Sequence, residues 1–291
     1  MHYRQLGRTG LQISEIGFGG APAGLRNYLG IWDPDQEQAE RSIAEAVSEA
    51  VSQGINYFDT APAYGEGAGE RLFGKALLPF RERAFVATKL AVGDEEHVHR
   101  SVEASLERLQ TGRIDVLQLH GSWYREEEVE AILGPGGALG GMQALQAEGL
   151  VRFIGFTTEG VNGPASRLIA SGAFDVLQIC YNLIFQHPYD PSRKAGPLYE
   201  AEAQGMGIVT MRPLTSGIFQ KWLGQVFPGE MSDPEAQDRL NEALLSFVLS
   251  NPLVDAALVG MRTAREARRN AAISQDAKYR FDPDWLHERY R

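Results

Sequence analysis

Short apolar runs alternate with longer amphipathic stretches along this chain. Uninterrupted apolar runs of this length are typical of strands buried on both faces. We therefore predict eight buried strands, at residues 16–19, 55–58, 84–88, 114–119, 153–156, 176–180, 208–211 and 256–259. In the stretches between them apolar residues recur every three to four positions, as over residues 36–52 and 98–109, which predicts helices.

Regular alternation of strands and helices requires parallel strands joined by crossover helices. Eight such units within 291 residues fit an α/β fold of the (β/α)₈ TIM barrel type better than an open doubly wound sheet. The repeated sequence Asp-Val-Leu-Gln, at residues 115–118 and 175–178, supports a repeating strand–helix unit. We expect a single barrel domain over residues 1–291.

Two segments fall outside the strand–helix alternation. Residues 3–14 carry the turn sequence "GRTG" between apolar and polar positions, which predicts an N-terminal β-hairpin within residues 1–15 that caps one end of the barrel. Residues 213–234 predict a long loop after the seventh strand, and loops of that length in compact domains are often functional.

The charge and composition of the chain disfavour some classes of binding partner. The formal net charge is -10 and the pI is near 5.2, which disfavours nucleic acid and anionic membranes as partners. Cys180 is the only cysteine, and no apolar run is long enough to span a bilayer. These features favour a cytoplasmic protein, and they leave the oligomeric state open.

Several candidate motifs fail on spacing. No glycine cluster satisfies G-x-G-x-x-G, so the Rossmann fingerprint is absent. Residues 69–76, "GERLFGKA", approach a P-loop, but Ala76 replaces the Ser or Thr that binds magnesium, and the context is helical. His97 and His99 are two residues apart and do not share a helix face, so we predict no metal site.

Ionisable residues stand at the ends of three consecutive predicted strands. Asp59, Lys89 and His120 are spaced by 30 and 31 residues, one strand–helix unit each. Side chains at the carboxyl ends of barrel strands converge on one mouth, where the active sites of such barrels lie. Tyr64 follows Asp59 by five residues, in a turn that overhangs the same mouth. We predict one catalytic site from these four residues.

This combination suits protonation of an oxyanion. An ammonium beside a phenol stabilises the phenolate, so we expect Lys89 to lower the pKa of Tyr64. Asp59 offsets the cost of burying the ammonium, and His120 can orient a carbonyl oxygen toward the Tyr64 hydroxyl. Each residue alone is as consistent with an ordinary packing role. A lysine at a barrel strand end also leaves open a Schiff-base lyase that uses Lys89 as nucleophile.

The same residues resemble the aldo-keto reductase family. "FDTAPAYG" at residues 58–65, "VATK" at 86–89 and "LQLH" at 117–120 are similar to the segments that carry that family's catalytic tetrad. The resemblance covers nearly the whole chain and implies that Asp59, Tyr64, Lys89 and His120 form the tetrad. It further implies reduction of aldehydes or ketones by hydride transfer from NADP(H), with Tyr64 as general acid.

The resemblance also implies a set of cofactor contacts. By this resemblance, the nicotinamide carboxamide contacts Thr157 and Thr158 of "IGFTT" and Gln178 of the sixth predicted strand. Met211, at the end of the seventh, lies against the nicotinamide ring. "RPLTSG" at residues 212–217 is similar to a loop that follows the pyrophosphate. Thr-Thr stands where the family usually has Ser-Asn, and Arg212 stands where it has serine. The loop residues implied are Arg212, Pro213, Leu214, Ser216 and Gly217.

"VGMRTAREARRN", at residues 259–270, is similar to the family's adenosine-binding segment. Four arginines within eight residues favour a 2′-phosphate and therefore NADP(H), whereas Glu266 in place of glutamine favours NAD(H) as the alternative. The residues implied are Gly260, Arg262, Thr263, Glu266, Arg269 and Asn270.

Large residues near the predicted strand ends indicate the substrate pocket. We predict an apolar, aromatic-walled cleft for a small carbonyl substrate. Its walls are expected to include Trp32, Trp123, Tyr124 and Tyr181. Within the same family resemblance, a non-catalytic subunit that binds NADPH as a redox sensor is the remaining alternative.

Overall fold

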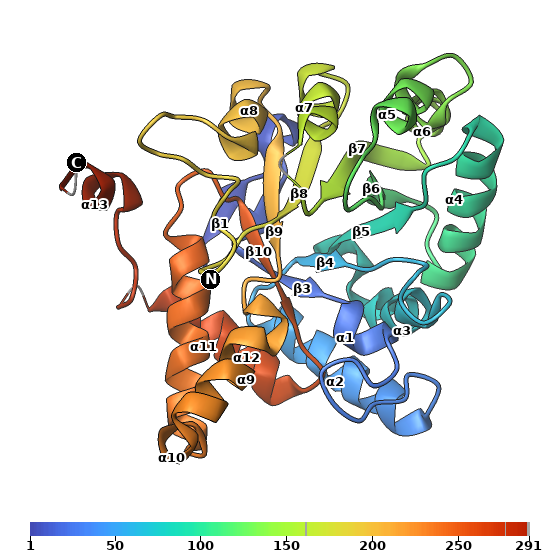
Figure 1. Cartoon of the computed structure of the whole chain (residues 1–291). Helices are drawn as coiled ribbons and strands as arrows, with labels where there is room; N and C mark the ends of the chain where they lie inside the picture. Colours follow the sequence, from blue (N-terminus) through green and yellow to red (C-terminus); the bar gives the residue numbers. More distant parts are fainter. Residues whose placement is uncertain (161, 277, 290–291) are drawn as a thin grey trace.

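A closed barrel of parallel strands forms the centre of the molecule. The computed structural model describes residues 1–160, 162–276 and 278–289. The strands close in the order β10-β3-β4-β5-β6-β7-β8-β9, so chain neighbours are also spatial neighbours (Figure 1). Their bounds are β3 (Ile16–Gly19), β4 (Tyr57–Asp59), β5 (Phe85–Leu90), β6 (Ile114–Leu119), β7 (Val151–Thr158), β8 (Val176–Cys180), β9 (Gly207–Met211) and β10 (Ala256–Gly260). The predicted (β/α)₈ barrel is confirmed.

Most of the helices surround the barrel and bury their apolar faces against it. The predicted helices over 36–52 and 98–109 correspond to α2 (Glu37–Ser52) and α4 (Glu95–Leu109). The near P-loop lies inside α3 (Ala68–Leu77), where a phosphate loop cannot form. The other helices are α1 (Ala21–Gly24), α5 (Glu126–Leu133), α6 (Ala138–Ala147), α7 (Gly163–Ala170), α8 (Pro197–Ala203), α11 (Pro234–Leu249), α12 (Ala264–Gln275) and α13 (Pro283–Arg289), with short 3₁₀ turns η1 (Gly7–Thr9) and η2 (Leu78–Arg83).

The N-terminal hairpin closes the amino end of the barrel, as predicted. β1 (Tyr3–Gln5) pairs antiparallel with β2 (Gln12–Ser14). Leu6, Leu11 and Ile13 are buried with side chains of the barrel interior, among them Val116 and Val209. Because this apolar plug fills the amino end, ligands reach the interior from the carboxyl ends of the strands.

The repeated Asp-Val-Leu-Gln has a structural explanation. Asp115 is the second residue of β6 and Asp175 directly precedes β8, and each accepts a backbone N–H of the preceding strand, from Val86 at 3.0 Å and Ile154 at 3.1 Å. The two glutamines meet inside the barrel, where Gln118 Nε2 donates to Gln178 Oε1 at 3.0 Å. The repeat therefore reflects alternate strands with the same register around one axis.

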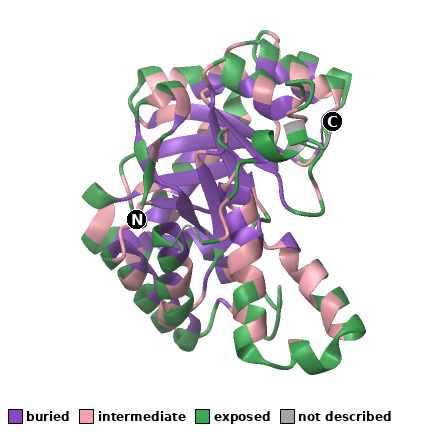
Figure 2. Cartoon of the chain, turned by 90° about the vertical axis from the view of Figure 1, so that its left-hand side faces the viewer, coloured by how far each residue is buried: buried purple, intermediate pink, exposed green. Residues whose placement is uncertain are grey.

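The segment after β9 differs from the predicted loop. Residues 213–234 contain η3 (Thr215–Gly217), α9 (Ile218–Val226) and α10 (Pro228–Met231), and α11 begins at Pro234. Ile218, Trp222 and Val226 recur every four residues, a helical pattern that the loop prediction overlooked. α9 and α10 project from the barrel and bury none of their residues (Figure 2).

None of the helices described in residues 1–160, 162–276 and 278–289 is long and apolar enough to cross a membrane.

Candidate active site

The four residues predicted from strand ends lie together at the open mouth of the barrel. Asp59 ends β4, and Lys89 lies near the end of β5. Lys89 Nζ is 2.7 Å from both carboxylate oxygens of Asp59 and donates to the Thr60 carbonyl at 2.8 Å. The same ammonium is 5.2 Å from the centroid of the Tyr64 ring. The Tyr64 and His120 rings meet edge to face at 5.8 Å.

Burial sets the protonation of the lysine and the tyrosine. Burial lowers the pKa of Lys89, but Asp59 and Tyr64 more than compensate, so its pKa is raised and the side chain is an ammonium at neutral pH. The pKa of Tyr64 is also raised, because burial disfavours the phenolate more than Lys89 favours it. The expected net lowering of the Tyr64 pKa is wrong for the protein alone. Tyr64 is therefore a protonated phenol across the neutral range.

His120 is neutral at physiological pH. Burial, followed by the positive charge of Lys89, lowers its pKa to about 4. A neutral imidazole retains one N–H donor and one acceptor nitrogen. It can therefore hydrogen-bond an oxygen placed beside the Tyr64 ring without adding a second positive charge next to Lys89.

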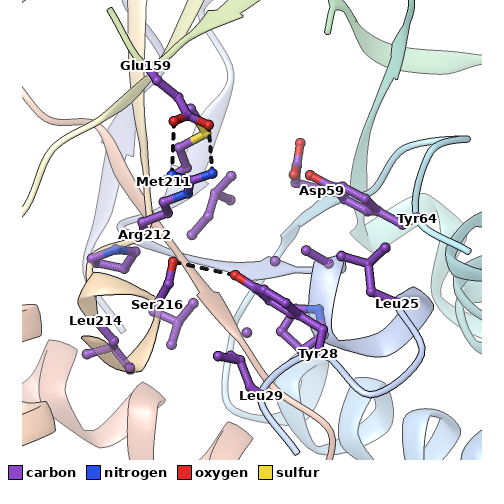
Figure 3. A pocket seen from close by; sticks show the side chains of 18 of the residues that line it. Leu25, Tyr28, Leu29, Asp59, Tyr64, Glu159, Met211, Arg212, Leu214 and Ser216 are labelled. Atoms are coloured by element: carbon purple, nitrogen blue, oxygen red, sulfur yellow. Dashed lines mark hydrogen bonds and ion pairs between the residues drawn. The ribbon is translucent and has the colours of Figure 1, made fainter. Parts of the chain in front are cut away.

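A cavity of about 900 Å³ extends outward from these four residues. Its inner end is lined by Asp59, Tyr64, Lys89 and His120, and its outer end by Gln237 and Asn241 of α11. Between the ends, Tyr28 Oη donates to Ser216 Oγ at 3.4 Å, a contact visible in Figure 3. This volume suits a ligand much larger than a simple carbonyl compound.

Most residues expected at the inner cofactor contacts line this cavity. Thr157 and Met211 do so from the ends of β7 and β9, and Gln178 from the middle of β8. Gln178 Oε1 accepts from Gln118, and its amide nitrogen lies 3.9 Å from the Met211 sulfur. Since that sulfur is only a weak acceptor, this amide N–H can turn to a carbonyl group of a ligand.

Thr158 has a different place. Its side chain is fully buried, and its hydroxyl lies within donating distance of two carbonyls, those of Ser122 at 3.0 Å and Gly160 at 3.1 Å. Successive strand residues point to opposite faces, so Thr157 faces the cavity and Thr158 does not. The Thr158 hydroxyl therefore joins the two loops that follow β6 and β7. This is a packing role rather than a cofactor contact.

The loop from Arg212 to Gly217 lines the cavity with a strained backbone. Pro213, Leu214, Ser216 and Gly217 all contribute to the wall. Arg212, Thr215 and Ser216 have φ of 59°, 53° and 52°, which L-residues other than glycine seldom adopt. Such strain costs on the order of 1 kcal/mol or more per residue and is concentrated at ligand sites.

The C-terminal segment is placed beside the cavity, with Gly260 in its lining. Arg262 donates to the carbonyls of Pro22 and Tyr28, and so holds the loop that forms one wall. Glu266 accepts from Thr263 in a capping box at the start of α12. Arg262, Thr263, Glu266, Arg269 and Asn270 are outside the lining residues of the cavity.

The other arginines of this segment have acidic partners on the protein. Arg265 and Arg269 pair with Asp238 of α11, and Arg268 pairs with Glu49 of α2. These pairs are exposed, so each contributes about 0–1 kcal/mol and can be exchanged for a stronger anion.

The four aromatic residues predicted for the substrate pocket do not line the cavity. Trp32 donates from its indole nitrogen to Ala23 and lies under the Arg262 guanidinium. Trp123 packs against Gly160, Tyr124 donates to the Thr157 carbonyl, and Tyr181 stacks on Phe247. These contacts are with neighbouring loops and elements of the barrel, α11 among them, so proximity to a strand end did not reveal the direction of the side chain.

The cavity has instead a polar wall that the sequence analysis missed. Ser122 and Glu159 follow β6 and β7, and Glu159 forms a two-pronged ion pair with Arg212, at 2.6 Å and 3.0 Å. The sequence contained a signal for this wall, because Glu159 directly follows the segment "IGFTT" and Ser122 lies two residues after His120, both at strand ends that had been assigned. Also missed were wall residues of the loop after β3, Leu25, Asn27, Tyr28, Leu29 and Gly30.

Comparison with known proteins agrees with this geometry. The model of the Aldo/keto reductase family matches residues 15–242. L-galactose dehydrogenase of Arabidopsis thaliana is 29% identical over 314 aligned residues, which cover 98% of this chain and 92% of that protein. A probable voltage-gated potassium channel subunit beta of Oryza sativa is 29% identical over 240 aligned residues, 75% of this chain and 65% of that protein.

The fold is shared with solved members of the family. A crystal structure of an aldo-keto reductase from Klebsiella pneumoniae in complex with NADPH superposes with a TM-score of 0.72. It is 19% identical, and the match covers 99% of this chain and 93% of that one. Because the family model matches residues 15–242, most of the 291 residues, the chain belongs to the aldo/keto reductase family.

Proposed function

We propose that this protein is an oxidoreductase that reduces aldehydes or ketones to alcohols with a nicotinamide cofactor. The observation that carries the proposal is the contact of Lys89 with Asp59 and Tyr64 at the inner end of a cavity of about 900 Å³, a volume that can hold a dinucleotide. Thr157, Gln178 and Met211 would hold the nicotinamide end, with the backbone of the loop 212–217 and Gly260 beside the phosphates. A bound reduced nicotinamide would supply the hydride.

The protein residues then handle the oxygen of the substrate. Neutral His120 donates to the carbonyl oxygen and directs it toward the Tyr64 hydroxyl. Tyr64 gives its proton to that oxygen as negative charge develops. The Lys89 ammonium stabilises the resulting phenolate, and Asp59 fixes the ammonium in place. A raised Tyr64 pKa keeps the donor protonated before each turnover.

Tyr64→Phe tests this assignment. Removing the hydroxyl leaves the ring in place, and we expect turnover on a simple aldehyde to fall by about 10²- to 10⁴-fold. Binding of the cofactor, followed by quenching of tryptophan fluorescence, should change little. Turnover within threefold of the wild type would contradict the assignment of Tyr64 as general acid.

For the cofactor we propose NADP(H), with NAD(H) as the alternative. Arg265 and Arg269 are the candidates to receive a 2′-phosphate, because both now pair with Asp238 across an exposed contact. Parallel titrations with NADPH and NADH decide between the two. Asp238→Asn should tighten NADPH more than NADH if these arginines bind the phosphate.

The Schiff-base alternative is disfavoured by the state of Lys89. A lysine nucleophile must be a free amine, whereas Lys89 donates to Asp59 and Thr60 and has a raised pKa. Borohydride in the presence of a carbonyl substrate should therefore trap no adduct on Lys89.

The similarity to a channel subunit favours a second candidate function, that of a subunit which binds the cofactor with negligible turnover. Tight NADPH binding without oxidation by any carbonyl compound would favour it.

A further inference from the structure

The wall opposite Tyr64 is polar, and its charges are balanced. Figure 3 shows the Glu159–Arg212 pair on one side of the cavity and Tyr64 on the other. Near the tetrad the two acids Asp59 and Glu159 are each paired with a base. The two cations beside these acids, Lys89 and Arg212, are therefore already paired when a substrate arrives, and the four aromatic residues expected in the wall do not line the cavity.

Glu159 and Arg212 are held in position by their surroundings. The Glu159 N–H donates to the Ser122 carbonyl at 2.9 Å, and Gly160 is fixed next to it. A Cβ on Gly160 would come within 2.4 Å of the Trp123 ring, so a larger residue there would require that ring to move. The Arg212 carbonyl accepts from the amide of buried Asn182 at 3.1 Å, and its φ is 59°. Because these side chains are already fixed before a ligand binds, little conformational entropy is lost on binding, and their positions can discriminate between ligands.

The pair is also accessible to a ligand. Its side chains retain 45% and 27% of their exposure, for Arg212 and Glu159 respectively. An apolar substrate that covered the pair would remove water from both charges and offer them no hydrogen bonds. A substrate with hydroxyl groups would donate to free lone pairs of Glu159 and accept from Arg212, which replaces the lost water.

We infer that Glu159 and Arg212 are specificity-determining residues that select an uncharged, polyhydroxylated carbonyl compound over an apolar one. The inference rests on the proposed carbonyl reduction at Tyr64 and adds the substrate class to it. Ser122, beside His120 in the same wall, supplies a further hydroxyl for such a ligand.

A matched pair of aldehydes tests the inference. Glyceraldehyde and propanal share a three-carbon chain and differ by two hydroxyl groups. The wild type should have the higher kcat/KM for glyceraldehyde. Glu159→Gln removes a charged acceptor, and we expect the glyceraldehyde-to-propanal ratio of kcat/KM to fall about tenfold. Arg212→Gln should lower the same ratio independently.

Glu126→Gln is the control variant. Glu126 forms an exposed ion pair with Arg167 on the outer helices, so this change should leave both rates and their ratio unaltered. An equal rate on both aldehydes in the wild type, or an unchanged ratio in both cavity variants, overturns the inference while leaving the proposed function intact. If neither aldehyde nor a wider carbonyl panel oxidises NADPH or NADH, the proposed function fails and the inference fails with it.

Discussion

The cavity contains two acid–base ion pairs that differ in how they are held. Asp59–Lys89 lies at the ends of adjacent barrel strands, and its side chains are only 3% and 1% exposed. Glu159–Arg212 joins two loops and is open to solvent. The buried pair is fixed by strand register and carries a charge that can act on Tyr64, whereas the exposed pair depends on loop contacts and can exchange partners with a ligand.

The two pairs should therefore differ in their effect on stability. Burial makes an unpaired charge costly, while water compensates for the loss of an exposed partner. Breaking the buried pair should cost the most stability and breaking the exposed pair the least. The titration of His120, which lies beside the buried pair, should have an effect of intermediate size.

Lys89→Met should give the largest effect. It leaves the Asp59 carboxylate buried without its ammonium, and we expect the free energy of unfolding to fall by about 3–5 kcal/mol. Urea denaturation measures the change. The double variant Asp59→Asn, Lys89→Met should recover part of the loss, because neither charge remains. A loss below about 1 kcal/mol in the single variant would show that the pair behaves like a surface contact.

His120 gives a pH-dependent effect of intermediate size. Its pKa is about 4 in the folded protein and 6.5 in the unfolded chain, so the unfolded chain binds more protons between these values. Stability is therefore lost as pH falls from 6.5 toward 4, by at most about 3 kcal/mol. Unfolding free energies measured across this range should be flatter for His120→Gln. The same slope in variant and wild type would exclude His120 as the titrating group.

Arg212→Gln should have the smallest effect on stability. Its pair with Glu159 is exposed, and we expect a loss of less than about 1 kcal/mol in urea denaturation. Arg167→Gln, which breaks the exposed pair with Glu126, provides the comparison. A loss above about 2 kcal/mol would mean that Arg212 holds the barrel loops together, and a change in substrate preference would then have a structural explanation.

The sequence was most informative where residues lie on strands. Asp59, Lys89 and His120 were found from their spacing alone, because equivalent positions on consecutive parallel strands reach the same mouth. Gln118 and Gln178 also occupy equivalent positions on two parallel strands, and their side chains meet inside the barrel. Helices α2 and α4 were also predicted from apolar periodicity, which reports the face that packs on the barrel.

Loop residues were predicted less well. Trp123 and Tyr124 were placed in the pocket because they follow a strand, yet their rings support neighbouring loops. Residues 213–234, which begin and end with proline, were predicted as an irregular loop. The apolar repeat that marks α9 within them is short. A loop backbone has no fixed period, so the direction of its side chains depends on contacts with distant segments.

The amino-acid sequence by itself determined the barrel, its capping hairpin and the grouping of the four polar residues at one end, since these follow from periodicity and spacing. Only the tertiary structure decided the sign of the Tyr64 pKa shift, the pairing of Glu159 with Arg212 and the partners of the C-terminal arginines. The physical reason is that burial and ion pairing depend on how closely residues far apart in the chain approach one another.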